Sequence, residues 1–401
     1  MTAQEMAKPV RKPLAVPEKV PATQRVLVVG GGVSGGTAAR MLLGFGLEVV
    51  LVEKGAGAQP FEGQAGAELL TEARLVGLEG NFGDFKATIE AGGQIVWRTV
   101  GAVVVAVGVR TEPAKEVPLA ITLTDFRRRM AAGEPIRNVC FLMDLEQSTP
   151  LAEFSLGLQF AFEAAQKKTS VYFLCRDVKV AEEGLERLYR SAREEGVLFI
   201  KNEARPTIAP LAEAASIQVM DLSPGAGSHL SRLCLTAEVI VVPEAFFPSE
   251  DNPGLAALLA TDLDTKGYFQ PANVRLAVGR TNRRGLFVLG DCRGPSSVAE
   301  TIERAEATAQ EIASLLGEGE KKVDWPVAVV DPEKCAYCLT CNRICPHKAA
   351  GMNLEEESAV IYASACYGCG LCVAECPSVA ITIEKFSDAA LVSSFASGGA
   401  G

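Results

Sequence analysis

Two short runs of cysteine near the end of the chain constrain its fold more than any other feature. Each run has the spacing C-x₂-C-x₂-C-x₃-C and is followed directly by proline. The runs consist of Cys335, Cys338, Cys341 and Cys345, and of Cys366, Cys369, Cys372 and Cys376. Zinc ribbons usually carry two C-x₂-C pairs, so this pattern of two quartets favours iron–sulfur clusters over zinc.

With this spacing, the fourth cysteine of each run ligates the cluster of the other run. We therefore expect two [4Fe–4S] clusters between residues 331 and 386. The first is assigned to Cys335, Cys338, Cys341 and Cys376, and the second to Cys345, Cys366, Cys369 and Cys372.

A glycine-rich turn near the N-terminus predicts a dinucleotide site. In RVLVVGGGVSGGTAARML, Gly30, Gly32 and Gly35 form G-x-G-x-x-G between an apolar strand and a helix. The first glycine permits the tight turn, the second lets the backbone approach a pyrophosphate, and the third lets helix and strand pack closely. The next strand, LEVVLVEK, brings Glu53 to a position suited to ribose hydroxyls.

Two later stretches favour FAD over NAD as the ligand of this turn. GAVVVAVG ends at Gly108 and reads as a short buried strand, and GLFVLGDCRGPSSVAETI has Gly290 and Asp291 before a helix that starts near Ser297. In flavoproteins with two dinucleotide-binding domains, such an aspartate and helix start meet the flavin. The expected FAD contacts are Gly30, Gly32, Val33, Ser34, Gly35, Glu53, Lys54, Gly108, Gly290, Asp291, Ser297 and Val298.

A second alternation of strands and helices covers residues 137–200, but its first turn reads DLEQSTPLAEF. This turn has no glycine fingerprint, and Asp144 and Glu146 would repel a pyrophosphate. The second strand ends in CRD, which offers no clear ribose contact. We therefore expect a nucleotide-binding-like domain that has lost its nucleotide.

The fold class that follows is α/β: a two-dinucleotide-binding-domain flavoprotein with an inserted second α/β domain and a C-terminal two-cluster, bacterial ferredoxin-like domain. We expect a flexible, basic, proline-rich tail over 1–24. The FAD domain is expected over 25–110 and 238–320, the degenerate domain over 111–237, the cluster domain over 331–386 and a tail over 387–401. GEGEKKVDWP reads as a linker, and RLCLTAEVIVVPE as one strand.

Composition excludes several classes of function. The net charge of −10 argues against nucleic acid as a partner, and the chain has no long apolar run that would span a membrane. The N-terminus has charges and prolines where a signal peptide needs an apolar core, so we expect a cytoplasmic protein with cysteines that bind metal. With only His229 and His347, the chain has little acid–base chemistry of its own.

The remaining cysteines, Cys140, Cys175, Cys234 and Cys292, lie in or beside apolar strands, and we expect buried, inert thiols. There is no Cys-x-x-Cys pair outside the cluster runs, so a thioredoxin-reductase mechanism lacks its dithiol. No catalytic side chain is assigned. A flavin can exchange two electrons, whereas an iron–sulfur cluster exchanges one at a time. We therefore expect the chain to couple two-electron transfer to one-electron transfer.

The chain resembles the A-subunit family of heterodisulfide reductase, flavoproteins of multi-enzyme electron-transfer complexes, and looks like a trimmed member of that family. The resemblance runs from about Arg25 to Phe386 and rests on VLVVGGGVSGGTAA, GAVVVAVG, RLYRSAREEGVLFI, LGDCRGPSSVAETI and the cysteine runs. The family commonly has a G-G-[KR] turn after the ribose-binding acid, but this sequence reads KGAGAQPFEGQAG. The family's additional cysteines between the flavin elements are also absent.

The resemblance implies an FAD- and iron–sulfur-containing electron-transfer subunit in a cytoplasmic hetero-oligomer, with the substrate site on partner subunits. It implies ferredoxin or a hydrogenase or dehydrogenase module as further partners, and flavin-based electron bifurcation as one option. A stand-alone NAD(P)H:acceptor oxidoreductase, like the glutamate synthase small subunit, is the alternative, and it needs a working second nucleotide site. A scaffold protein without flavin chemistry is a third reading, favoured by the altered KGAGAQPFEGQ turn.

Overall fold

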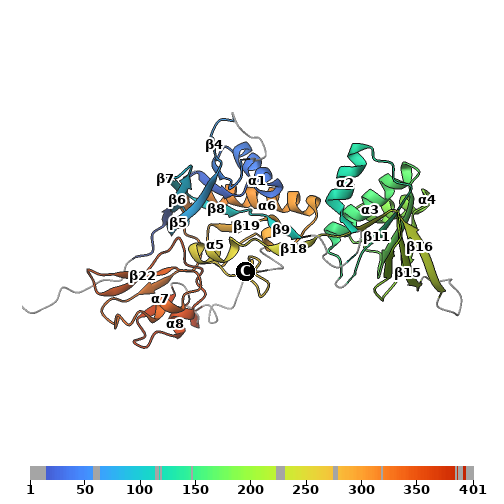
Figure 1. Ribbon diagram of the computed structural model, residues 1–401. Coiled ribbons are helices and arrows are strands. Elements are labelled where there is room, and N and C mark those ends of the chain that lie inside the picture. The colour runs from blue at the N-terminus through green and yellow to red at the C-terminus, as the bar shows by residue number, and fades with distance from the viewer. Residues whose placement is uncertain are drawn as a thin grey trace, which may run out of the picture. The chain divides into compact units, whose positions relative to one another are not determined.

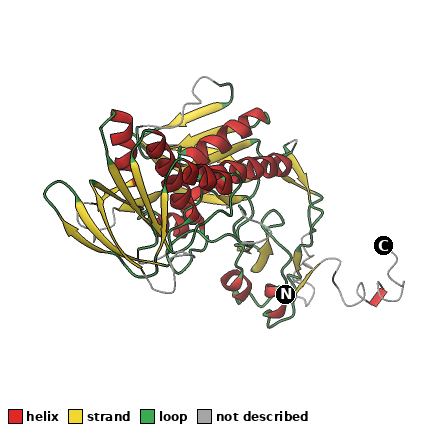
Figure 2. Cartoon of the chain, turned by 90° about the vertical axis from the view of Figure 1, so that its right-hand side faces the viewer, coloured by secondary structure: helices red, strands yellow, loops and turns green. Residues whose placement is uncertain are grey.

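The structure is a computed structural model that describes residues 15–56, 64–112, 117, 120–145, 148–222, 231–273, 279–317, 319–383, 386 and 392–393. It divides into two compact units. The first comprises residues 1–108, 249–294 and 301–401, and the second comprises residues 109–248 and 295–300. Helices and strands recur throughout the described chain (Figure 1, Figure 2). None of its helices has the length and apolar character needed to cross a membrane.

A parallel five-stranded sheet forms the centre of the first unit, with the order β19-β8-β2-β3-β4. Its strands are β2 (Arg25–Val29), β3 (Glu48–Val52), β4 (Ala67–Leu70), β8 (Ala102–Val105) and β19 (Leu286–Val288). The strand order reverses between β2 and β8. In open α/β sheets such a switch point lies beside the ligand crevice.

Both faces of this sheet are buried, as the continuous apolar runs of its strands predict. Val26 and Val28 pack with the residues of α1 (Val33–Gly44) and α6 (Val298–Leu316) on one face. Leu27 and Val29 pack on the other face, against α5 (Asn252–Leu259) and a three-stranded antiparallel sheet. That sheet consists of β5 (Ala73–Asn81), β6 (Asp84–Ala91) and β7 (Gln94–Val100).

The second unit repeats this three-layer plan. Its parallel sheet has the order β10-β17-β11-β12-β13, with α2 (Leu123–Ala132), α3 (Leu151–Gln166) and α4 (Leu185–Glu194) packed on one face. An antiparallel sheet of β14 (Thr207–Pro210), β15 (Ala215–Asp221) and β16 (Ser231–Ala237) covers the other face. The parallel strands are β10 (Ala120–Thr122), β11 (Asn138–Leu142), β12 (Ser170–Cys175), β13 (Leu198–Lys201) and β17 (Val239–Val242). The α/β fold class is therefore confirmed.

The structure corrects the boundary expected at residue 238. RLCLTAEVIVVPE is not one strand, because Ala237 ends the antiparallel β16 and Val239 begins β17, which pairs in parallel with β10 and β11. Both strands therefore belong to the second unit. This unit begins at Val109 and continues to Pro248, where β9 (Val109–Glu112) and β18 (Ala245–Pro248) pair antiparallel.

The cysteine-rich region forms two similar halves. In the first, α7 (Thr340–Ile344) lies within the first cysteine run, and in the second, α8 (Leu371–Ala374) lies within the second run. Antiparallel pairs join β21 (Ala328–Val330) to β24 (Ile381–Ile383) and β22 (Ala350–Asn353) to β23 (Ser358–Ile361). The core of this region is continuous with the α1–α6 face of the first unit, because Val327, Cys341 and Ile381 share one apolar cluster with Val26.

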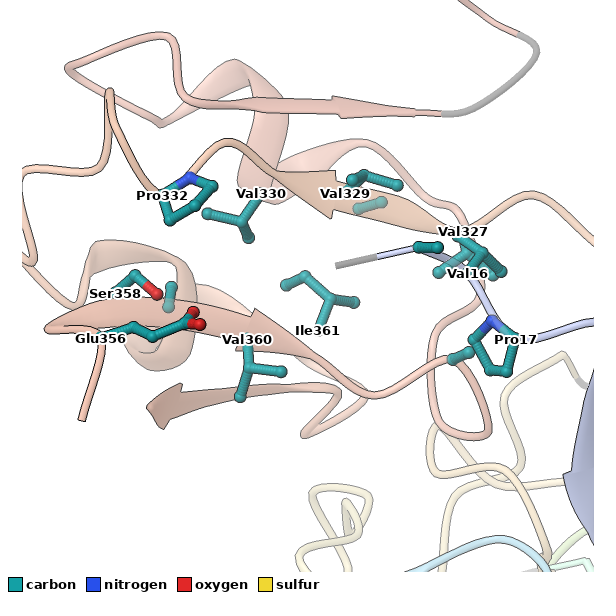
Figure 3. A pocket seen from close by; sticks show the side chains of 14 residues that line it. Val16, Pro17, Val327, Val329, Val330, Pro332, Glu356, Ser358, Val360 and Ile361 are labelled. Carbon is teal, nitrogen blue, oxygen red and sulfur yellow. The ribbon is translucent and has the colours of Figure 1, made fainter. Parts of the chain in front are cut away.

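The tail expected over residues 1–24 is wrong for its second part. β1 (Lys19–Pro21) pairs antiparallel with β20 (Glu320–Lys322), and the side chain of Val20 is only 5% exposed. Val16 and Pro17 line a small apolar cavity beside Val327 (Figure 3). GEGEKKVDWP is likewise not a free linker, because it contains β20. Residues 1–14 and most of the tail at 387–401 lie outside the described residues.

Candidate functional site

The glycine-rich turn lies at the switch point of the first unit's sheet. β2 ends at Val29 and its parallel neighbour β8 ends at Val105, so their carboxyl ends open on the same edge. Gly30 follows β2 directly, and α1 begins at Val33. Free N–H groups and the positive end of the helix dipole at this place suit an anion such as a pyrophosphate.

The three fingerprint glycines have different surroundings. A Cβ on Gly30, whose φ is +106°, would lie 2.4 Å from the carbonyl oxygen of Ala106, and a Cβ on Gly35 would lie 1.8 Å from the carbonyl oxygen of Gly30. A Cβ on Gly32 would have no protein atom within 4 Å. Gly30 and Gly35 are thus required by packing, whereas Gly32 leaves open the space that a close ligand needs.

Glu53 connects the end of β3 to the same turn. Its carboxylate accepts hydrogen bonds from the backbone N–H of Gly31 at 2.6 Å and of Gly55 at 2.9 Å. The following residue, Lys54, forms an exposed ion pair with Asp251 at 2.7 Å. The carboxylate of Glu53 therefore lies at the loop where a ribose would be bound, while Lys54 contacts another carboxylate. Residues 57–63 of the altered turn lie outside the described residues.

Gly290 and Asp291 follow β19 at the same edge of the sheet. Gly290 has a φ of +66°, and a Cβ there would lie 2.5 Å from the hydroxyl oxygen of Ser34, which is itself buried. Asp291 lies in the short 3₁₀ helix Gly290–Arg293. A Cβ on Gly108, after β8, would meet nothing within 4 Å. The structure therefore brings the fingerprint, Gly108 and the Gly290–Asp291 pair to the carboxyl ends of adjacent strands.

Ser297 and Val298, which the sequence analysis expected to contact the flavin, belong to the second unit. They fall within residues 295–300, at the start of α6. The hydroxyl oxygen of Ser297 accepts a hydrogen bond from the backbone N–H of Glu300 at 3.2 Å, and the hydroxyl donates to Glu182. Ser297 thus caps the N-terminus of α6. The sequence analysis expected a helix to start near this residue.

Three of the four remaining cysteines are buried and have thiols that resist ionisation. Burial raises the pKa of Cys175 and of Cys292 to about 12 and raises that of Cys140 as well. The Cys292 thiol donates to the carbonyl oxygen of Leu289 at 3.0 Å. Cys234 contradicts the expectation, because it is exposed on β16 beside Ser216.

The second unit fills its own switch point with an internal ion pair. Asp144 follows β11, is 4% exposed and has a φ of +54°. Its carboxylate accepts hydrogen bonds from the Thr149 backbone N–H at 2.6 Å and from Lys179 Nζ at 2.6 Å. Burial opposes ionisation of this carboxyl, but these bonds outweigh burial and lower its pKa. A negative charge thus stands where a pyrophosphate would bind; Glu146 lies outside the described residues.

The four cysteines assigned to the second cluster line one small cavity. Its walls include Cys345, Cys366, Cys369 and Cys372, with Pro346, His347 and Tyr367 beside them. Cys345 comes from the first cysteine run and the other three from the second. Burial, with the negative charges of Cys366, Cys345 and Cys369, raises the pKa of Cys372 to about 12. The cavity and its thiol donors fit an iron–sulfur cluster, whose iron would offset the repulsion between these thiolates.

The other four cysteines also interact with one another. Burial raises the pKa of Cys341, and the nearby charges of Cys335, Cys338 and Cys376 raise it further. Here Cys376 comes from the second run. Among the described residues, no three His, Cys, Asp or Glu side chains converge tightly enough to hold a single metal ion. Cys341 also raises the pKa of Cys372, which belongs to the other set, so the crossed assignment of the eight cysteines stays a prediction.

Backbone N–H groups support the cysteine sulfurs in matching positions of the two halves. The N–H of Ala349 donates to Cys345 Sγ at 3.4 Å, and the N–H of Ala380 donates to Cys376 Sγ at 3.3 Å. Such bonds stabilise a thiolate and tune the potential of a cluster.

A contact that the sequence analysis missed lies beside the second cysteine set. Arg284 precedes β19, and its guanidinium lies between the rings of Trp325 and Tyr367. Trp325 is one of two tryptophans in the chain, which is the only sequence signal that could have drawn attention to this place. The contact lies at the amino end of β19, whereas Gly290 and Asp291 follow its carboxyl end.

Comparisons with known proteins agree with the resemblance drawn from the sequence. Residues 328–377 match the family model described as "4Fe-4S dicluster domain". The iron-sulfur A subunit of the CoB–CoM heterodisulfide reductase of Methanocaldococcus jannaschii is 29% identical over 185 residues, which cover 45% of this chain and 27% of that protein. A protein of Archaeoglobus profundus, described as similar to the A subunit of heterodisulfide reductase, is 29% identical over 188 residues, covering 47% and 26%. The match thus spans just over a quarter of these relatives.

Among solved structures, the thioredoxin reductase of Lactococcus lactis is similar with a TM-score of 0.48 and 17% identity, covering 73% of this chain and 98% of that one. The dicluster match implies iron–sulfur clusters as cofactors. The glycine turn at the sheet's switch point, with Gly108 and the Gly290–Asp291 pair at the ends of the neighbouring strands, fits FAD.

Proposed function

We propose that the chain is an FAD- and iron–sulfur-containing electron-transfer subunit of a heterodisulfide reductase-like complex in the cytoplasm. The observation that carries the proposal is that one unit combines a glycine turn at a sheet switch point with two runs of four cysteines. The relatives are named as subunits, and one is the A subunit of the H(2)/formate:CoB-CoM heterodisulfide,ferredoxin reductase of Methanococcus maripaludis. The proposed partners are other subunits of such a complex, with ferredoxin or a hydrogenase or dehydrogenase module.

In this proposal the chain's own residues bind and orient cofactors. The N-terminus of α1 and the open space at Gly32 receive the pyrophosphate, and Glu53 binds a ribose. The crossed cysteine sets hold two [4Fe–4S] clusters. When bound, FAD supplies two-electron chemistry, and the clusters exchange electrons singly. The substrate site lies on partner subunits, and the complex is a hetero-oligomer.

We further propose that this electron transfer is flavin-based electron bifurcation. In it, two electrons that arrive together at the crevice leave one at a time for acceptors of different potential. A reduced acceptor of low potential, formed only in the presence of a second acceptor of high potential, is the result that distinguishes bifurcation from simple transfer.

The alternative function, a stand-alone NAD(P)H:acceptor oxidoreductase, needs a nucleotide site in the second unit. The ion pair of Asp144 and Lys179 at the end of β11 argues against it, because a buried carboxylate repels a pyrophosphate. The described part of that turn also has no glycine that would let a backbone approach a phosphate.

Anaerobic flavin reduction tests the two functions against each other. NADH or NADPH is added to the cofactor-loaded chain, and in a parallel sample a dithionite-reduced ferredoxin is added, while flavin absorbance is followed. We expect no bleaching by either nucleotide and prompt bleaching by the reduced ferredoxin. Rapid bleaching by NADH or NADPH contradicts the proposal of an electron-transfer subunit and supports the stand-alone reductase. A chain that retains no FAD supports the scaffold reading.

A further inference from the structure

A half-buried arginine lies beside the Cys345–Cys366–Cys369–Cys372 set. Arg284 Nη2 donates a hydrogen bond to the carbonyl oxygen of Cys366 at 3.0 Å. The centre of its guanidinium lies 4.1 Å from the Trp325 ring and 4.6 Å from the Tyr367 ring. The two aromatic faces and the cysteine carbonyl therefore fix the cation next to a residue assigned as a cluster ligand.

The neighbours of Arg284 hold the same place together. Asn282 Nδ2 donates to the Pro346 carbonyl oxygen at 2.9 Å, and His347 Nδ1 lies 2.6 Å from the carbonyl oxygen of Asn282. The His347 ring stacks on Tyr367 with ring centres 4.4 Å apart. The segment before β19 is thus bound to both Cys345–Pro346 and Cys366–Tyr367, so Arg284 cannot move away from this cysteine set without breaking several contacts.

No carboxylate in the described chain forms an ion pair with Arg284. Asp324 lies close enough to attract the guanidinium, but it is exposed. The neighbouring Arg280 pairs with Glu311 instead. Arg284 Nε is buried without a hydrogen-bond partner. Partial burial of a cation without an ion-pair partner costs free energy, so negative charge beside Arg284 would stabilise it.

An iron–sulfur cluster held by four thiolates supplies such charge. It is net negative, and it becomes more negative by one charge when it takes up one electron. A fixed positive charge beside it stabilises the reduced form more than the oxidised form, which raises the reduction potential.

The other cysteine set has an arginine in a different environment. Arg343 Nη2 donates to the carbonyl oxygen of Cys338 at 2.9 Å, but the Arg343 side chain is exposed. Water and salt screen an exposed charge much more than a buried one. The two clusters therefore have cations at comparable hydrogen-bond distances from a ligand carbonyl, but the half-buried Arg284 charge is screened less than the exposed Arg343 charge.

We propose that Arg284 is a positioning and charge-supplying residue that makes the Cys345–Cys366–Cys369–Cys372 cluster the more easily reduced of the two. The inference rests on the proposed function in that it needs both clusters. It goes beyond that function because it states which cluster has the higher reduction potential and names Arg284 as the cause of the difference between the two potentials.

The test is a redox titration of the cofactor-loaded full chain, with titanium(III) citrate as the electron donor and both cluster signals followed by electron paramagnetic resonance. We expect two separate one-electron couples in the wild-type chain. In Arg284→Gln, we expect the equilibrium constant for reduction of the higher-potential cluster to fall at least tenfold. This corresponds to a decrease of about 59 mV in the reduction potential of a one-electron couple. The lower couple stays where it was. Arg343→Gln, the matched control, moves only the lower couple, and by less.

Arg284→Lys separates charge from packing. It keeps the positive charge but not the planar stacking, so we expect the gap between the couples to persist. Collapse of the gap in Arg284→Lys overturns the proposal, as does a shift of both couples or of neither in Arg284→Gln. If Arg284→Gln fails to retain iron, the lysine variant alone decides. A wild-type chain with one cluster signal or none instead refutes the proposed function on which the inference rests.

Discussion

At the residue scale, the glycines of the turn after β2 differ in what surrounds them. Gly30 and Gly35 have backbone atoms where a Cβ would stand, so the fold itself demands them. Gly32 has open space there and an ordinary, extended backbone, with φ −69° and ψ −164°. Packing around position 32 therefore gives no reason for a glycine there, apart from the preference of a helix N-cap for glycine over alanine, whereas a ligand in contact with the backbone does.

This difference predicts opposite effects for two alanine substitutions. Gly35→Ala forces atoms together in a buried turn and should destabilise the fold by about 1–3 kcal/mol or more. Gly32→Ala should lower the stability of the FAD-free protein by no more than about 1 kcal/mol, the loss expected when alanine replaces glycine at a helix N-cap, but should reduce the FAD retained after purification. Urea unfolding and the ratio of FAD to protein measure the two effects.

Gly44 provides the matched control for both variants. It lies in α1, has no positive φ, and a Cβ there would meet nothing within 4 Å. Gly44→Ala should leave the FAD content unchanged and should raise the free energy of unfolding by up to about 1 kcal/mol, because alanine favours a helix more than glycine does. Full FAD retention by Gly32→Ala would show that no ligand approaches the turn closely, and the flavin assignment of the crevice would fail.

At the scale of elements, the turn between β11 and α3 shows how the second unit occupies its own crevice. Lys179 Nζ lies 2.6 Å from Asp144 Oδ1, and the side chains of the two residues are 20% and 1% exposed. Lys179 thus compensates the charge of the buried Asp144 carboxylate at the sheet's switch point.

Removing Lys179 should therefore be costly. Lys179→Met leaves the Asp144 carboxylate buried without its counter-charge, and we expect a loss of roughly 3–5 kcal/mol in the free energy of unfolding. Lys201→Met is the control, because Lys201 and Asp177 form an exposed pair in the same unit, with side chains 45% and 76% exposed. That loss should stay below about 1 kcal/mol. Equal losses in urea unfolding would mean that the buried pair has no special role.

Most of the parallel strands were predictable, although β4 and β10 were missed, and the antiparallel ones were mostly not. Runs such as VLVV in β2 and VCFL in β11 are apolar on both faces because helices and a second sheet cover them. β5–β7 were missed, since their alternation of exposed and buried residues is interrupted, for example by a register shift between Leu75 and Gly77. β1 was missed because its partner β20 is distant in the sequence.

At the scale of the whole molecule, the sequence led to specific candidate cofactor-binding residues but not to their surroundings. Cysteine spacing alone led to the crossed sets, because that spacing is tied to one ligand geometry. The boundary of the second unit was misplaced because a single residue, Glu238, separates two strands of different sheets. Arg284 could not be found from its neighbours in the chain, since Trp325 and Tyr367 reach it only through the fold.

The central claim is that one chain combines a flavin with two four-iron clusters. The measurement that tests it most directly is the content of FAD and iron in the chain, purified and reconstituted without oxygen, per mole of protein. The account predicts one FAD and about eight irons, four for each cluster. An iron content near four, or protein without FAD, would contradict it.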